Sequence, residues 1–199
     1  MRLISLSVLA TIGAFCGSAT VASADVTALV TTQTYDISGT TGEALIRSMN
    51  RNGPRHGFMA RAIAQTSYTK DWDFDFVQAK GACRIGRANG TLKLKVTLPR
   101  VASTLPPGLE KRWVRFFAGV RRHEETHADI ARQMMAATEK SLVGLTVPND
   151  ARCFKARREA KRRIDAIFDD YEDKQNAFDA SEHREGGHVE YLVEALAKS

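Results

Sequence analysis

The sequence predicts an α+β fold, with a small antiparallel sheet in the N-terminal half and two long helices in the C-terminal half. Apolar and polar residues alternate over short stretches of the first half, which is the period of half-buried strands. In the second half, apolar residues recur every three or four positions over two long stretches, as on the buried face of a helix. The 199 residues suffice for one domain with its own core.

Turn and capping residues divide the first half into elements. We expect a short strand at Tyr35 to Ile37 and a helix from about Gly42 to Met49, capped by Thr41. A strand is expected around the alternating segment Asp71 to Phe76, and Asn89-Gly90 is expected to form a hairpin turn before a further strand. The first half is therefore predicted to be mainly a small antiparallel sheet.

Two helices account for most of the second half. Pro106-Pro107-Gly108 introduces a helix expected from about Leu109 to Val143, because proline is tolerated in a first helical turn. Another helix is expected from roughly Asp150 to Gln175. The tail after it is predicted to be polar rather than part of the core, since it contains Asp179, Glu182, His183, Gly186, Gly187, His188 and Tyr191.

The start of the chain has the anatomy of a secretory signal peptide. Arg2 precedes an apolar run from Leu3 to Phe15, and Ala22-Ser23-Ala24 is a small-x-small cleavage site. The apolar run is too short for a membrane span, and no later segment of the sequence looks transmembrane. We therefore expect a signal peptide at 1–24 and one mature domain at 25–199, in the periplasm or secreted.

Charge and cysteine content agree with export. The chain has a formal charge of +6, and much of the excess lies in the basic segment 152–163. Export argues against a nucleic-acid partner, and interleaved carboxylates favour a solvated helix face; contact with an anionic envelope surface is the alternative. An oxidising compartment favours a disulfide between Cys83 and Cys153, the two cysteines of the predicted mature chain.

One motif points to a reaction. Residues 123–127 read H-E-x-x-H, and residues four apart share a helix face, so His123 and His127 can bind one metal ion with Glu124 beside it. The two histidines interrupt a helix face that is otherwise apolar. Buried imidazoles need partners for their nitrogens, and a zinc ion can serve both. The alternative is a pair of structural histidines, each hydrogen-bonded to a carboxylate or carbonyl.

This motif predicts an exported zinc metalloprotease that acts on a polypeptide substrate. Zn²⁺ held by His123 and His127 lowers the pKa of a bound water, and Glu124 acts as the general base that accepts its proton. The third ligand is open on spacing alone. Ile130 and Gln133 replace the glycine and histidine of the extended metzincin pattern, which leaves as candidates Glu159, His183 and His188.

An ordered set of landmarks extends over nearly the whole predicted mature chain. They are Tyr35, Gly39, Gly53-Pro54, Trp72, Phe74, Cys83, Thr97-Leu98-Pro99, Trp113, Phe116, His123 to His127 and Cys153. Together they resemble the bacterial family catalogued as domain of unknown function 922 (DUF922), whose members are predicted to be secreted zinc-dependent proteases. The resemblance implies a zincin-like metallopeptidase domain.

The resemblance also bears on the third metal ligand. The family often ends in an aromatic-Asp-x-x-Thr-x-His-Gly stretch, and the segment from Phe178 to Arg184 is similar but one residue shorter. It therefore implies His183 as the third ligand, with His188 and Glu159 as alternates.

Two other functions compete with a zinc metallopeptidase. One is a non-catalytic, envelope-associated binding protein in which the metal site is structural or vestigial. The other is a zinc amidase that acts on cell-wall material. Zinc content and the effect of replacing Glu124 separate the non-catalytic protein from the two hydrolases.

Overall fold

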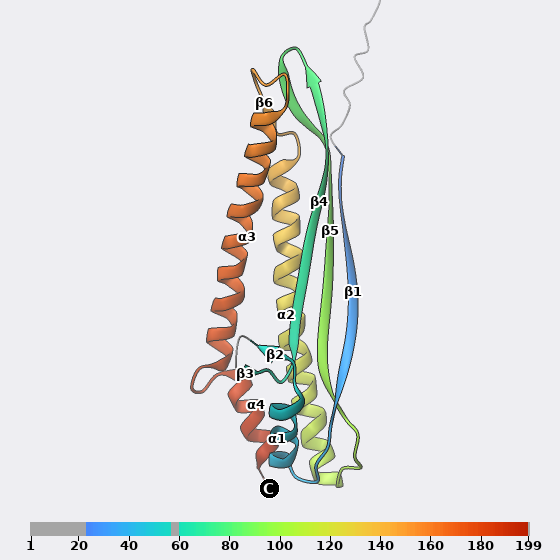
Figure 1. The fold of residues 1–199 in the computed structure, drawn as a ribbon. Coiled ribbons are helices and arrows are strands. Elements are labelled where there is room, and N and C mark those ends of the chain that lie inside the picture. The colour runs from blue at the N-terminus through green and yellow to red at the C-terminus, as the bar shows by residue number, and fades with distance from the viewer. Residues whose placement is uncertain (1–22, 57–59, 199) are drawn as a thin grey trace, which may run out of the picture.

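A sheet of three long strands runs along the molecule, and two long helices pack on one of its faces (Figure 1). The computed structural model describes residues 23–56 and 60–198, so the predicted signal peptide lies outside the described residues except for Ser23 and Ala24. The predicted α+β class is confirmed, with the sheet in the N-terminal half and the long helices in the C-terminal half. None of the described helices is long and apolar enough to span a membrane.

The strand directions differ from the prediction. Strands β1 (Ser23–Ile37), β5 (Ala82–Val101) and β4 (Gln65–Ala79) lie side by side in that order, and β6 (Thr146–Val147) also pairs with β5. β5 is antiparallel to β4 and β6 but parallel to β1. The sheet is therefore mixed. Strand β4 runs in the opposite direction to β1, and after the turn at Lys80 and Gly81 strand β5 runs in the same direction as β1.

Strand β1 is also much longer than the predicted strand Tyr35 to Ile37. It is an outer strand of the sheet, and its hydrophobic residues Leu29 and Val30 are 51% and 53% exposed. Residues 27–34 of β1 are exposed on both faces, so this stretch lacks the alternation of buried apolar and exposed polar residues by which a strand is predicted from sequence.

The predicted hairpin turn at Asn89-Gly90 is wrong. The β4–β5 turn lies at Lys80 and Gly81, both with positive φ, and β5 continues through Gly90, which pairs with Trp72. A Cβ atom at Gly90 would lie 2.7 Å from the Cε atom of Met135 and 2.9 Å from the Trp72 ring. The glycine thus allows close packing of a helix and an aromatic ring against the strand rather than a turn.

The two long helices lie side by side on the sheet (Figure 1). Helix α2 (Pro107–Leu142) agrees closely with the prediction, whereas α3 (Phe154–His183) continues well beyond the predicted end at Gln175. The basic segment forms the exposed start of α3 and is partly neutralised, for example by the ion pair between Lys161 and Asp165. Contact of this segment with an anionic envelope surface stays a prediction.

Short elements gather at one end of the molecule (Figure 1). Helix α1 (Gly42–Asn52) begins as predicted, with the Thr41 hydroxyl accepting a hydrogen bond from the Ala44 N–H at 3.2 Å. A small separate sheet, β2 (Arg55–His56) and β3 (Ala60–Arg61), follows α1.

The last helix corrects the prediction of a polar tail. Helix α4 (His188–Ala197) buries Leu192 and Leu196 in a cluster with Leu45 of α1 and Phe116 of α2. Polar residues precede this helix in the sequence, but its own apolar residues recur at helical spacing.

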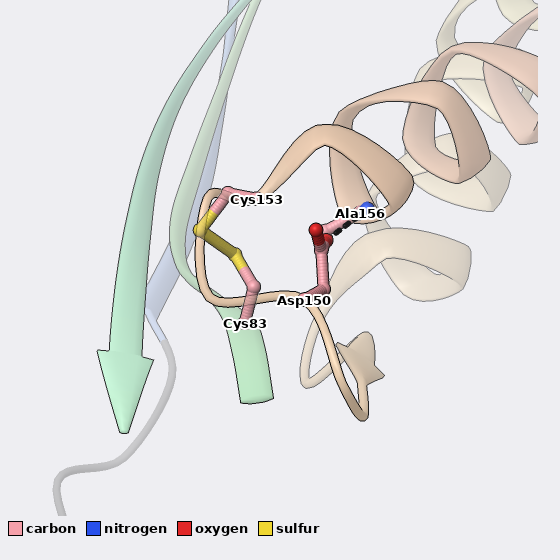
Figure 2. The surroundings of a disulfide bond; sticks show 4 residues. All are labelled: Cys83, Asp150, Cys153 and Ala156. Carbon is pink, nitrogen blue, oxygen red and sulfur yellow. Dashed lines mark hydrogen bonds between the residues drawn. A yellow bond between two sulfur atoms is a disulfide. The ribbon is translucent and has the colours of Figure 1, made fainter. Parts of the chain in front are cut away.

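A disulfide bond lies at the opposite end of the molecule. Cys83 of β5 and Cys153 form the predicted disulfide, which joins positions 70 residues apart (Figure 2). Beside it, the Asp150 carboxylate accepts a hydrogen bond from the N–H of Ala156 at 2.8 Å and so caps the start of α3 (Figure 2). The disulfide therefore ties α3 to the sheet where that helix begins.

Candidate metal centre

Helices α2 and α3 bring three potential ligand atoms together. His123 and His127 project from the middle of α2, one turn apart, and Asp179 projects from the last turns of α3. The two Nε2 atoms lie 3.1 Å apart. Oδ1 of Asp179 is 3.2 Å from Nε2 of His123 and 2.9 Å from Nε2 of His127. The three atoms form a nearly equilateral triangle.

The triangle fits a single tetrahedral ion. Zinc binds imidazole nitrogen and carboxylate oxygen at about 2.0 to 2.2 Å, which separates two ligands of a tetrahedral ion by about 3.3 to 3.6 Å. The three atoms are slightly closer together than this and would need only a small outward shift. Electron-pair donors at such separations repel one another unless a proton or a cation lies between them. Two imidazoles and one carboxylate form the donor set of a zinc site that keeps a fourth position open.

The electrostatics of the triangle favour a cation. Burial alone would lower the pKa of His127, but the hydrogen bonds with Asp179 and Gln175 outweigh burial and raise this pKa above its usual value. Burial alone would raise the pKa of Asp179, whereas its hydrogen bonds with His123 and His127 bring it far below its usual value. Asp179 therefore stays ionised beside two imidazoles that are 8% and 13% exposed.

Glu124 lies next to the triangle in a buried setting. The residue is 5% exposed, and its Oε2 atom has no hydrogen-bond partner among the described residues. Its backbone carbonyl accepts a hydrogen bond from the hydroxyl of Thr66 on β4 at 3.1 Å. Burial raises the pKa of the Glu124 carboxyl. A buried carboxyl group with a raised pKa is suited to accept a proton and return it.

A cavity of about 870 Å³ opens onto these side chains. This volume falls in the range of ligand-binding clefts in proteins. Helices α2, α3 and α4 and strand β4 all contribute to it. Apart from the triangle and Glu124, its walls include apolar residues such as Ile63, Val120 and Val193 and polar residues such as Tyr68 and Glu172.

His183, the third ligand that the resemblance implies, lies at the edge of this group. It follows Asp179 by one turn of α3, and its Nε2 atom is 3.9 Å from the Asp179 carboxylate. Potential ligand atoms of His123, Asp179 and His183 lie within 4.8 Å of one another, so these three residues could also hold an ion. The side chain of His183 is 55% exposed, which places it at the solvent side of the triangle.

The two alternates lie away from the centre. Glu159 precedes Asp179 by more than five turns of the same helix, a distance of about 30 Å. It forms ion pairs with Arg162 and Arg163, whose hydrogen bonds lower its pKa to about 2. His188 is exposed at the first residue of α4 and is not part of the group that could hold a metal.

Sequence reasoning missed Asp179 as a ligand because it ended the second helix at Gln175. With α3 continuing to His183, Asp179 and His183 become neighbours on one helix face, four residues apart. The signal was present in the sequence, since the DUF922 pattern has an aspartate directly after its aromatic residue, and Phe178-Asp179 matches it.

Fold and site together define an α+β protein in which two antiparallel helices build a candidate metal centre on one face of a mixed sheet. A family model described as "Bacterial protein of unknown function (DUF922)" matches residues 32–188, so the chain belongs to the DUF922 family. The match includes the triangle and Glu124. Searches of the curated proteins and of the solved structures found no match.

Proposed function

We propose that this protein is an exported zinc-dependent peptidase. The observation that carries the proposal is the triangle of His123 Nε2, His127 Nε2 and Asp179 Oδ1, which lies beside the buried carboxyl group of Glu124 and opens onto a cavity. The disulfide supports export, because such bonds persist in oxidising compartments.

Each residue of the centre has a role in this proposal. His123, His127 and Asp179 would hold the ion, and bound zinc supplies a Lewis acid that polarises a carbonyl group and acidifies water. Glu124 accepts the proton of the attacking water and passes it to the leaving amine. Its burial serves this role, because burial raises the pKa of the carboxyl group, and a carboxyl group with a raised pKa more readily takes up and returns a proton.

A peptide bond is the favoured substrate because of the shape and lining of the cavity. Val120 of α2 and Val189 and Val193 of α4 provide an apolar wall beside the triangle. Such a wall can hold a side chain of a polypeptide while the adjacent bond lies at the triangle. An amide of cell-wall material has the same reacting group, so a peptide library and a cell-wall fraction are both needed as substrates in the test.

One observation favours a second, non-catalytic function. His183 could share an ion with His123 and Asp179, and if His127 bound the same ion, four protein ligands would close the site, as in structural zinc sites. In that case the protein would hold its ion without turnover. The exposure of His183 and its longer distance from Asp179 favour the peptidase.

Zinc content and hydrolysis separate the two functions. We expect one tightly bound zinc ion per chain and cleavage of a peptide library by the mature protein. Glu124→Gln should keep the zinc but lose about 10²- to 10⁴-fold in cleavage rate, because it removes the general base. Glu125→Gln, an exposed neighbour on the same helix, is the matched control and should cleave normally.

The variant His183→Ala distinguishes the peptidase from the non-catalytic protein. The peptidase should keep its zinc in this variant, whereas a closed four-ligand site should lose most of its affinity. Cleavage by Glu124→Gln at the wild-type rate would disprove the general-base role, and a wild-type protein that binds no zinc would disprove the proposed function as a whole.

A further inference from the structure

We propose that Gln175 is a positioning residue that turns the ring of His127 so that its Nε2 atom faces the candidate metal centre. This inference rests on the proposed zinc site and deepens it. Gln175 does not belong to the triangle; it acts through the ring that it holds.

The hydrogen bonds of Gln175 that bear on the candidate metal centre lead to His127, and its side chain also interacts with the hydroxyl of Tyr68. Gln175 is 9% exposed and projects from α3 one turn before Asp179. Its amide nitrogen donates a hydrogen bond to the backbone carbonyl oxygen of His127 at 3.0 Å. Its amide oxygen lies 2.5 Å from Nδ1 of the same residue. The side chain therefore contacts both the main chain and the ring of His127.

The two contacts together determine the hydrogen positions on the ring. A carbonyl oxygen only accepts hydrogen bonds, so the NH₂ group of the Gln175 amide must face it. The amide oxygen then faces Nδ1 of His127, and because this oxygen also only accepts, Nδ1 must carry the hydrogen. In a neutral imidazole the lone pair is then on Nε2, the atom that faces His123 and Asp179.

The consequence is a ring prepared for a metal. With Nδ1 carrying the hydrogen, Nε2 of His127 shares a proton with the carboxylate oxygen 2.9 Å away only when the ring is charged, and a bound cation takes the place of that proton. A cation at this point satisfies both atoms at once. Residues that hold the second ring nitrogen of a ligand histidine in this way commonly change metal affinity by about 10- to 100-fold when they are replaced.

The other histidine of the motif lacks such a partner. Nδ1 of His123 is buried without a hydrogen-bond partner among the described residues, and the carboxylate of Glu182 is 3.7 Å away. His127 is therefore the histidine of the motif whose ring is held by a hydrogen bond at Nδ1. Because Gln175 and Asp179 are four residues apart, one face of α3 supplies both a proposed ligand and the group that orients another.

Two variants of Gln175 test this role. Gln175→Leu removes both hydrogen bonds, whereas Gln175→Glu keeps an acceptor for the Nδ1 hydrogen. We expect Gln175→Leu to bind zinc about 10- to 100-fold more weakly than wild type in competition with a chelator, and Gln175→Glu to bind within about threefold of wild type. Gln133→Leu, at an exposed position on α2, is the matched control and should not change zinc affinity.

A spectroscopic measurement separates positioning from simple packing between the helices. In zinc-loaded wild type and Gln175→Glu, the Nδ1 hydrogen of His127 should give a slowly exchanging proton NMR signal. In Gln175→Leu the signal should exchange rapidly, while circular dichroism shows that the metal-free variant is folded. Should Gln175→Leu not fold, Gln175→Met replaces it in both measurements, because methionine is similar in length and its thioether is only a weak acceptor for the Nδ1 hydrogen.

The outcomes are distinct. Equal zinc affinity in wild type and Gln175→Leu would overturn the role of Gln175 and leave the proposed function intact. A loss in Gln175→Glu as large as that in Gln175→Leu would also overturn it, because the hydrogen bond to the backbone carbonyl would then explain the effect. A wild-type protein without zinc would overturn the proposed function itself.

Discussion

Asp179 sets the charge of the proposed zinc site. Two neutral imidazoles and one carboxylate would leave a net charge of about +1 on the complex, whereas three histidines would leave about +2. The carboxylate of Asp179 contacts both rings of the triangle, and its low pKa keeps it ionised. The aspartate therefore provides the attraction that draws a cation into a largely buried site.

This role predicts that charge matters more than shape at Asp179. Asp179→Asn has the same size but no negative charge, and we expect it to weaken zinc binding by more than about 100-fold. Asp173→Asn, on the exposed side of α3, should bind zinc as the wild type does. Chelator competition measures both. If Asp179→Asn kept its zinc while His183→Ala lost it, His183 would be the third ligand, as the family resemblance implied.

The residues of the site differ in how far the sequence could identify them. His123, Glu124 and His127 belong to one helix, where a spacing of four residues fixes their relative positions. Asp179 follows His127 by 52 residues, and Gln175 follows it by 48. Their approach depends on how α3 packs against α2, which no local pattern records.

At the scale of elements, the errors have physical causes that can be named. The Asn89-Gly90 pair has the composition of a hairpin turn, but Gly90 is needed because Trp72 and Met135 leave no room for a side chain. Helix α3 has no glycine or proline near Gln175, and the sequence between Gln175 and His183 contains no helix stop. A continuous helix is thus the simpler interpretation of that segment.

The start of α3 depends on a charged cap. Burial would raise the pKa of Asp150, but hydrogen bonds from the backbone N–H groups of Ala156, Lys155 and Phe154 outweigh it and lower the pKa. A lowered folded-state pKa means that the ionised form stabilises the fold above the usual pKa of about 3.9. This contribution is lost as the pH falls through the folded-state pKa.

We therefore expect Asp150→Asn to lower the free energy of unfolding at neutral pH, since the amide can still accept a hydrogen bond but has no charge. The difference from wild type should shrink as the pH falls below about 4, where the wild-type carboxyl group also becomes neutral. Urea unfolding at a series of pH values measures this, with Asp173→Asn as the control. A difference that did not change with pH would show that the cap does not act through its charge.

At the scale of the whole molecule, the sequence predicted the class but not the sheet. Alternation and helical spacing are local, so they indicated strands first and helices second. The parallel pairing of β1 with β5 joins segments separated by α1, β2, β3 and β4. Such a pairing has no local signal, because it depends on where the chain returns after those elements.

The disulfide and the candidate metal centre lie near opposite ends of α3. The disulfide joins β5 to the start of α3, whereas Asp179 lies 26 residues after Cys153 on that helix, a distance of about 39 Å. Between them, α2 and α3 pack on the sheet through a cluster that includes Leu94, Ala131 and Ile167. The position of Asp179 therefore depends on this packing rather than on the disulfide.

This separation predicts that stability and metal affinity respond differently when the disulfide is removed. A variant with both Cys83→Ala and Cys153→Ala frees a segment whose ends are 70 residues apart, and the chain-entropy model gives a loss of up to about 4 kcal/mol in the free energy of unfolding. Zinc affinity should stay within about twofold of wild type while the protein is folded. Urea unfolding of metal-free protein and chelator competition measure the two quantities. A large loss of zinc affinity in the folded variant would show that the disulfide holds the register of α3 against α2 along its whole length.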